Sequence, residues 1–208
     1  NAKYAAMVHS VDDAMGRVLQ TLDELDLFDE TMIIFTSDNG GLVPKTSNVP
    51  LRNGKGSPYE GGIRVPWIVH LPGVTRPGTV DATPVITCDI KPTVLEALQI
   101  SATDSAAVDG IPVQRLVSDE AACSRSLFWH FPHYRKPWTP YAVIRKGPYK
   151  LIRWFEDNEC ELYDLEEDLG EQHNLAAAQP QQTQVMVEEL DAWLTSVNAR
   201  LPQPRASP

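Results

Sequence analysis

The chain has 208 residues, of which 42% are hydrophobic and 22% charged, and a formal net charge of −10. A chain of this length can bury a sizeable core without disulfides or a structural metal. The negative charge argues against a nucleic-acid partner, because it would repel a phosphate backbone. No apolar run approaches the roughly 20 residues of a membrane span.

The first half of the chain alternates helical and strand patterns. Apolar residues recur at spacings of three and four over residues 4–25, which predicts a long amphipathic helix. Met32 to Thr36 is apolar without alternation, as in a central strand that is covered on both faces. A second strand at Trp67 to Leu71 and a helix from Asp89 to Leu98 follow, with Asp89 as N-cap. We therefore expect an α/β domain over residues 1–110, containing part of a mixed, mostly parallel sheet flanked by helices.

The pattern changes after about Ser124. Short strand-like runs are separated by turn residues, and an amphipathic helix follows Pro180. This predicts a small α+β subdomain over residues 111–200, in which four antiparallel strands pack on one helix. The four runs are Ser126–Phe131, Tyr141–Arg145, Tyr149–Phe155 and Glu161–Tyr163. Residues 101–109 are expected to form a surface linker and 201–208 a loose tail.

Two oxygen donors follow the first predicted strand. Asp38 and Asn39 begin the loop 38–62, which is longer than a simple connection requires. A carboxylate and an amide carbonyl suit a hard cation such as Ca²⁺ or Mg²⁺, and ligands of open α/β sheets bind at strand ends. The alternative is that Asp-Asn-Gly-Gly is simply a turn.

Lys55 lies between Gly54 and Gly56 in the same loop. The glycines let the backbone approach a ligand closely while the ammonium contacts an oxyanion. The alternative is a solvated loop lysine. Glu60 and Arg64 are spaced to pair and brace the loop, and Arg52 can brace it as well or face the substrate.

A histidine cluster lies at the end of the third predicted strand. His130 and His133 stand among aromatic residues, with Arg135 and Lys136 next to them. Such a surface can contact an anionic, ring-bearing substrate. The alternative is a strand end with a packed aromatic side and solvated histidines. The spacing is not that of a zinc protease. Zinc ligation by cysteine is also not expected, because the three widely spaced cysteines form no Cys-Xaa-Xaa-Cys pair: Cys88, Cys123 and Cys160.

In this order the motifs resemble the downstream half of a type I, formylglycine-dependent sulfatase of the alkaline-phosphatase superfamily. The residues that carry the resemblance are Thr36-Ser37-Asp38-Asn39-Gly40-Gly41, Pro50-Leu51-Arg52-Asn53-Gly54-Lys55-Gly56, Tyr59-Glu60-Gly61-Gly62-Ile63-Arg64-Val65-Pro66, Asp89-Ile90-Lys91-Pro92-Thr93, Glu161-Leu162-Tyr163-Asp164-Leu165 and Glu171-Gln172-His173-Asn174-Leu175. The match covers nearly the whole chain, so it is more specific than any single motif.

The resemblance implies a hydrolase for sulfate esters of small molecules or saccharides. Asp38 and Asn39 align with two metal ligands, with Ca²⁺ favoured over Mg²⁺, and Lys55 with a lysine that contacts the sulfate. In that family a cysteine or serine of a Cys/Ser-Xaa-Pro-Ser-Arg motif is oxidised to formylglycine, which attacks sulfur. This chain lacks the motif. We therefore expect formylglycine in a missing N-terminal half, which would be needed as a partner for activity.

The family usually works outside the cytoplasm, so a periplasmic, secreted or lysosomal location is expected. Two other functions remain open. A related enzyme of the superfamily can act on phosphate esters or phosphonates, and a non-catalytic scaffold or binding module can retain the same fold.

Overall fold

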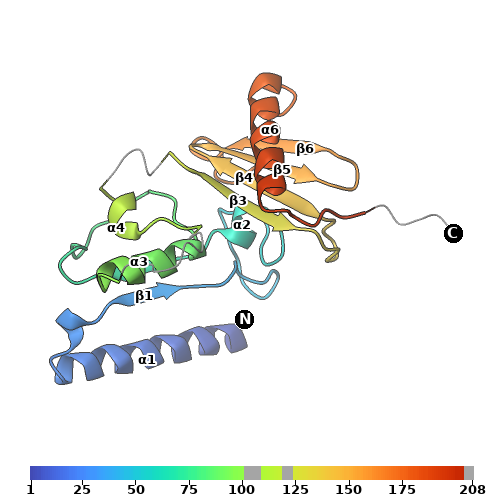
Figure 1. The fold of residues 1–208 in the computed structure, drawn as a ribbon. Helices are drawn as coiled ribbons and strands as arrows, with labels where there is room; N and C mark the ends of the chain where they lie inside the picture. Colours follow the sequence, from blue (N-terminus) through green and yellow to red (C-terminus); the bar gives the residue numbers. More distant parts are fainter. Residues whose placement is uncertain (101–108, 119–123, 204–208) are drawn as a thin grey trace. The chain divides into compact units, whose positions relative to one another are not determined.

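The computed structural model describes residues 1–100, 109–118 and 124–203, which divide into two compact units (Figure 1). The first unit contains residues 1–37 and 66–125, and the second contains residues 38–65 and 126–208. The loop that carries Asp38 and Lys55 therefore belongs to the same unit as the C-terminal sheet. The domain boundaries at residues 110 and 200 remain predictions, since this division follows compactness alone. The linker expected at 101–109 and Cys123 lie largely outside the described residues.

The first unit begins with helix α1, Ala2–Glu24, as its 3.6-residue periodicity predicts. The side chain of Asn1 accepts a hydrogen bond from the amide of Tyr4 at 3.3 Å and caps the helix. None of the helix's residues is buried, and Met7 and Val18 on its apolar face are 66% and 53% exposed. The periodicity thus predicted the helix correctly, but the described part of this unit leaves most of its apolar face exposed.

Strand β1, Ile33–Thr36, follows the short 3₁₀ helix η1, Phe28–Glu30. It pairs antiparallel with β2, Trp67–His70, so that Ile33 lies opposite His70. All four residues of β1 are half-buried. The predicted parallel neighbours and complete burial are not found in the described residues. An apolar run indicates that a strand is shielded, but it does not encode the direction of the partner strand.

A buried carboxylate organises the rest of this unit, which contains η2, Thr87–Asp89, and helices α3, Ile90–Ala97, and α4, Val113–Leu116. Asp89 is fully buried and occupies the N-cap position of α3, but its side chain does not cap that helix. Its oxygens instead accept hydrogen bonds from the amides of Ile86 and Ile111 at 2.8 and 2.9 Å. They also accept two from the guanidinium of Arg125, at 2.7 and 2.5 Å. Asp89 therefore joins three segments that are distant in sequence.

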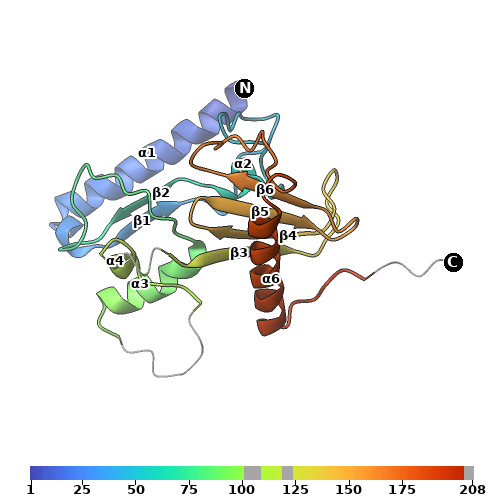
Figure 2. The ribbon, with the colours of Figure 1, turned by 90° about the horizontal axis from the view of Figure 1, so that it is seen from above.

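The second unit contains the four-stranded antiparallel sheet and the C-terminal helix that the sequence predicted, together with the loop 38–65. Its sheet has the order β3-β4-β5-β6 with every neighbouring pair antiparallel. Helix α6, Pro180–Ser196, crosses one face of this sheet (Figure 2). The strands are β3, Ser126–Phe131; β4, Tyr141–Lys146; β5, Tyr149–Trp154; and β6, Cys160–Asp164.

The two faces of the sheet carry two separate apolar clusters. Alternate strand residues and three residues of α6 form the first cluster: Ala142, Ile144, Leu151, Leu162, Met186, Leu190 and Leu194. The second, on the opposite face, includes Tyr59 of the loop 38–65: Tyr59, Tyr141, Val143, Ile152, Tyr163 and Leu165. Because successive side chains of a strand point to opposite faces, the helix and the loop are held on opposite sides of one sheet.

Candidate functional site

The loop 38–65 folds back on itself through backbone hydrogen bonds. The amide of Gly40 donates to the carbonyl of Gly62 at 2.9 Å, and the amide of Lys55 donates to the carbonyl of Gly41 at 3.0 Å. Lys55 is thereby held beside the Asp38-Asn39-Gly40-Gly41 segment, although 17 positions separate it from Asp38. The structure thus brings together the backbone segments of three predicted site residues: Asp38, Asn39 and Lys55.

Gly54 permits this close approach. A Cβ atom at position 54 would lie 2.3 Å from the carbonyl oxygen of Gly41 and 2.6 Å from Nδ2 of Asn48. The same Asn48 amide donates to the carbonyls of Gly41 and Asn53, both at 2.9 Å. The residue before Lys55 is therefore a glycine because two backbone segments pass against each other there.

Asp38 and Lys55 are both exposed, and Asn39 is half-buried. Within residues 1–100, 109–118 and 124–203, neither the carboxylate of Asp38 nor the ammonium of Lys55 has a hydrogen-bonding or ion-pair partner in the protein. Both charged groups are thus available to a ligand.

The donors present fit a hard divalent cation in kind. Carboxylate and amide oxygens are typical Ca²⁺ and Mg²⁺ ligands, but Ca²⁺ takes about six to eight of them. No group of three or more His, Cys, Asp or Glu side chains suitable for a metal is found among the described residues. Asp38 and Asn39 can therefore supply only part of a coordination shell.

Arg52 is engaged within the protein. Its guanidinium carbon lies 3.9 Å from the ring centroid of Tyr59, and Nη1 donates to the hydroxyl of Tyr163 at 2.9 Å and to the carbonyl of Glu171 at 2.7 Å. These contacts fasten the loop to β6 and to the turn that follows it. Of the two roles that the sequence left open for Arg52, this geometry is that of a brace.

A carboxylate that the sequence did not single out completes this brace. The hydroxyls of Tyr59 and Tyr163 donate to Oε2 of Glu161 at 2.9 and 2.6 Å, and Nε1 of Trp154 donates to Oε1 at 2.9 Å. Burial first, and then the charge of Glu161, raise the pKa of both tyrosines well above their usual range. Both phenols therefore stay protonated and act as donors at neutral pH.

Glu60 lies in the short helix α2, Glu60–Ile63, and is 2% exposed. Its Oε1 lies 2.9 Å from Nζ of Lys150, which is itself 2.8 Å from Oε1 of Glu171. Oε2 of Glu171 also accepts the amide of Glu60 at 2.7 Å. Arg64, the predicted partner of Glu60, lies farther away, with Nη1 3.7 Å from Oε2. The strongest contacts of Glu60 are thus with residues that the sequence did not indicate.

The two predicted histidines lie apart. Nε2 of His130 is 2.9 Å from the carbonyl oxygen of Arg200, and its ring packs edge-on against Phe155, in the cluster beneath α6. His133 is exposed and packs edge-on against Phe131, which belongs to the opposite face. The two rings thus contact different aromatic side chains, and their joint role in one substrate surface stays a prediction.

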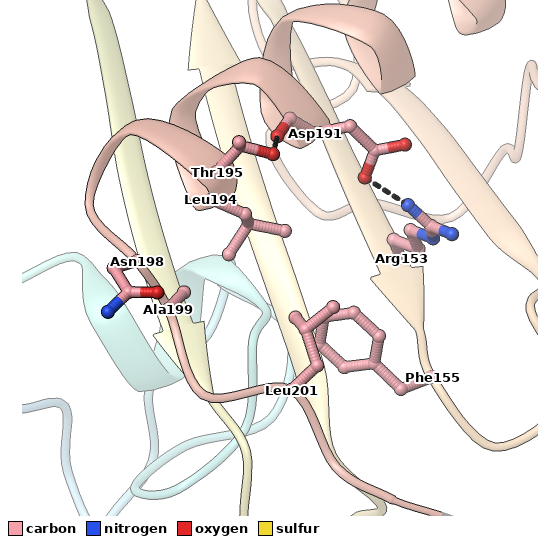
Figure 3. A pocket seen from close by; sticks show the side chains of 8 residues that line it. All are labelled: Arg153, Phe155, Asp191, Leu194, Thr195, Asn198, Ala199 and Leu201. Atoms are coloured by element: carbon pink, nitrogen blue, oxygen red, sulfur yellow. Dashed lines mark hydrogen bonds and ion pairs between the residues drawn. The ribbon is translucent and has the colours of Figure 1, made fainter.

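A pocket of about 460 Å³ opens beside the C-terminal end of α6 (Figure 3). It contains an ion pair between Arg153 and Asp191 and no predicted site residue. Since its walls come from the α6 side of the sheet, it lies on the opposite face from the loop 38–65. Its lining residues are Arg153, Phe155, Asp191, Leu194, Thr195, Asn198, Ala199 and Leu201.

The fold and the loop motifs define a class of protein. Residues 1–100 match the Sulfatase family, and residues 54–200 match the family described as N-sulphoglucosamine sulphohydrolase, C-terminal. The chain belongs to the sulfatase family. None of the described helices is both long and apolar enough to cross a membrane.

Relatives share this similarity over most of the chain. It is 38% identical to a sulfatase of Formosa agariphila over 95% of its length, and 30% identical to human Arylsulfatase A over 89%. The crystal structure of Ps i-CgsB in complex with k-i-k-neocarrahexaose superposes with a TM-score of 0.82 at 29% identity, over 91% of the chain. The chain spans 40%, 43% and 42% of these three relatives, respectively, so it corresponds to less than half of each.

Proposed function

We propose that the protein hydrolyses sulfate esters, with a sulfated saccharide as the favoured substrate class. Membership of the sulfatase family supports the reaction, and the saccharide bound by Ps i-CgsB supports the substrate class. The observation that carries the assignment to this site is the backbone hydrogen bond from Lys55 to Gly41, which holds the backbone of Lys55 beside the segment Asp38-Asn39-Gly40-Gly41. The ammonium of Lys55 has no partner among the described residues.

In this proposal the ammonium of Lys55 binds a non-bridging sulfate oxygen and orients the ester. Negative charge on the sulfuryl oxygens is stabilised best by a fixed cation whose position does not change during the reaction. The hydrogen-bonded loop fixes the backbone from which the ammonium of Lys55 extends. Asp38 and Asn39 would hold part of the shell of a divalent cation, with Ca²⁺ favoured, which would further neutralise the sulfate when bound.

The remaining ligands and the formylglycine nucleophile are proposed to come from another part of the protein, as the family resemblance implies. A working compartment outside the cytoplasm belongs to the same proposal. The buried residues around Glu60 and Glu161 do not take part in the chemistry. Their role is to keep the loop 38–65 on the sheet.

The test is a substrate panel with the full-length protein. Release of inorganic sulfate from 4-nitrophenyl sulfate and from sulfated oligosaccharides is compared with hydrolysis of 4-nitrophenyl phosphate and of a phosphonate monoester. We expect kcat/KM to be highest for a sulfate ester. A higher kcat/KM for the phosphate or the phosphonate would indicate a phosphate-ester or phosphonate hydrolase instead. If no ester were hydrolysed, a non-catalytic scaffold would be favoured.

The cation has its own test. Removal of divalent metal with a chelator should abolish sulfate release, and Ca²⁺ should restore it. Asp38→Ala should weaken Ca²⁺ binding in calorimetry, whereas Asp29→Ala, at an exposed position before β1, should not. Equal Ca²⁺ affinity in the wild-type protein and Asp38→Ala would remove Asp38 from the metal site.

A further inference from the structure

The connection between β3 and β4 holds a second cation against the loop 38–65. Arg135 and Trp138 exchange backbone hydrogen bonds, with N–O distances of 3.0 and 2.6 Å, which closes the tip of this hairpin. Trp138 also packs edge-on against Tyr59 of the loop, with ring centroids 5.8 Å apart. The hairpin tip is therefore fixed on the face of the sheet that carries the candidate site.

Arg135 lies directly against Gly56, the residue after Lys55. A Cβ atom at position 56 would lie 2.7 Å from Nη1 and 2.8 Å from Cζ of Arg135. Gly56 also has a φ of 90°, which L side chains rarely adopt, and its carbonyl accepts the hydroxyl of Tyr141 at 3.4 Å. The glycine thus allows the guanidinium to stand next to the backbone of Lys55.

Within the part of the chain that the structure describes, both cations lack a carboxylate partner. Arg135 is exposed, and across the described residues its guanidinium makes no ion pair, as is also true of Lys55. Two cations carried by neighbouring backbone segments favour a ligand with two negative groups, and the planar fork of arginine suits a sulfate or carboxylate.

We propose that Arg135 forms a subsite for a second acidic group, a sulfate or carboxylate, on the saccharide whose scissile sulfate is bound by Lys55. This inference rests on the proposed function and adds the charge pattern of the substrate. It makes Arg135 a specificity residue: it distinguishes a multiply charged saccharide from a singly charged one and leaves the reacting ester to Lys55.

The experiment compares the full-length protein with its Arg135→Gln variant. The probes are neocarrahexaoses of equal length that carry fewer or more sulfate groups. Apparent affinity is taken as KM where the saccharide is turned over, and as the inhibition constant against 4-nitrophenyl sulfate where it is not. Lys45→Gln is the matched control, because it removes an exposed positive charge from the loop 38–65 at a position outside the proposed subsite.

We expect Arg135→Gln to bind the more highly sulfated saccharide about 10-fold to 100-fold more weakly. This is the range for losing charge-assisted hydrogen bonds. The affinity of Arg135→Gln for the less sulfated saccharide, and the affinity of Lys45→Gln for either saccharide, should change by less than about 2-fold. An equal loss for both saccharides would show that Arg135 only supports the loop, and no loss for either would remove it from substrate binding. Each of these results would overturn the subsite.

Failure of the proposed function gives a different result. If the wild-type protein released no sulfate from any probe, the hydrolase assignment would fall. Calorimetric binding of the same saccharides to the wild-type protein and to Arg135→Gln would then decide the subsite directly, since a selective loss for the more sulfated saccharide supports it and its absence contradicts it.

Discussion

Nζ of Lys150 lies 2.9 Å from Oε1 of Glu60, and neither side chain is more than 2% exposed. Together with Glu171, this pair joins helix α2 of the loop 38–65 to strand β5. Breaking a buried ion pair leaves an uncompensated charge in a medium that solvates it poorly. The position of the candidate site therefore depends on an ionic contact that takes no part in the chemistry.

Lys150→Met should be strongly destabilising. It leaves two buried carboxylates without their cation, so we expect a loss of about 3–5 kcal/mol in the free energy of unfolding. Lys146→Met is the matched control, because Lys146 pairs with Glu189 at 2.7 Å but is 48% exposed, and its loss should be about 1 kcal/mol or less. Urea unfolding of the two variants checks this. Equal losses would mean that burial of the Lys150 cluster contributes nothing.

The same cluster predicts a pH dependence. Burial raises the pKa of Glu171 above its ordinary 4.5, although Lys150 acts in the opposite direction. A raised pKa in an acid means that the folded state binds more protons than the unfolded state, so stability falls as pH rises from about 4.5 through the folded-state pKa. The stability of the wild-type protein relative to Glu171→Gln should therefore decrease as pH rises across this interval. Thermal unfolding measured from pH 4 to pH 8 tests the sign, and a relative increase would contradict it.

Asp89→Asn should destabilise the first unit. The carboxylate of Asp89 accepts hydrogen bonds from two backbone amides and from the guanidinium of Arg125. In Asp89→Asn the new NH₂ group would point a donor at these donors. A loss of about 3–5 kcal/mol is expected for a buried, paired carboxylate. Asp81→Asn, at an exposed position whose carboxylate accepts local hydrogen bonds from Thr83, including its amide at 2.8 Å, should lose about 1 kcal/mol or less. Similar values for both variants would show that the Asp89 contacts are not structural.

His130 and His133 should respond differently to alanine. His130→Ala removes the contact with the carbonyl of Arg200 and the packing on Phe155, and should lower stability by about 1–2 kcal/mol with little effect on KM. His133→Ala alters an exposed ring on the face of the loop and should change stability by about 0.5 kcal/mol or less, so any effect falls on substrate affinity. Unfolding curves and KM values for both variants separate the roles, and the reverse pattern would contradict them.

The C-terminal strands could be predicted because their signals are local. Asp157-Asn158 and Lys146-Gly147-Pro148 mark turns, and Asn158 and Gly147 do adopt positive φ values of 61° and 55°. The partner of β1 could not be predicted in this way, since β2 follows about thirty residues later. For strands so far apart in the sequence, an apolar run predicts that the strand is shielded, but not whether its partner runs parallel or antiparallel to it.

The brace around the site was missed although one signal was present. In Tyr149-Lys150-Leu151-Ile152, strand alternation places Lys150 on the same face as the fully buried Ile152, which implies a buried lysine that needs an acid. The same alternation separates His130 from Phe131. Glu171 lies in a turn without periodicity, so its contact with Lys150 had no local signal. The prediction that Glu60 and Arg64 brace the loop identified two members of this network and not its centre.

Lys55→Ala in the full-length protein tests the central claim most directly, with Lys45→Ala, another exposed lysine of the same loop, as the control. The quantity to measure is kcat/KM for the best sulfate ester, together with the melting temperature. We predict a fall of about 100-fold to 1,000-fold for Lys55→Ala, as for the loss of one fixed group that stabilises the transition state, at an unchanged melting temperature. Lys45→Ala should retain wild-type kinetics. A kcat/KM for Lys55→Ala within about 2-fold of the wild-type value would contradict the account.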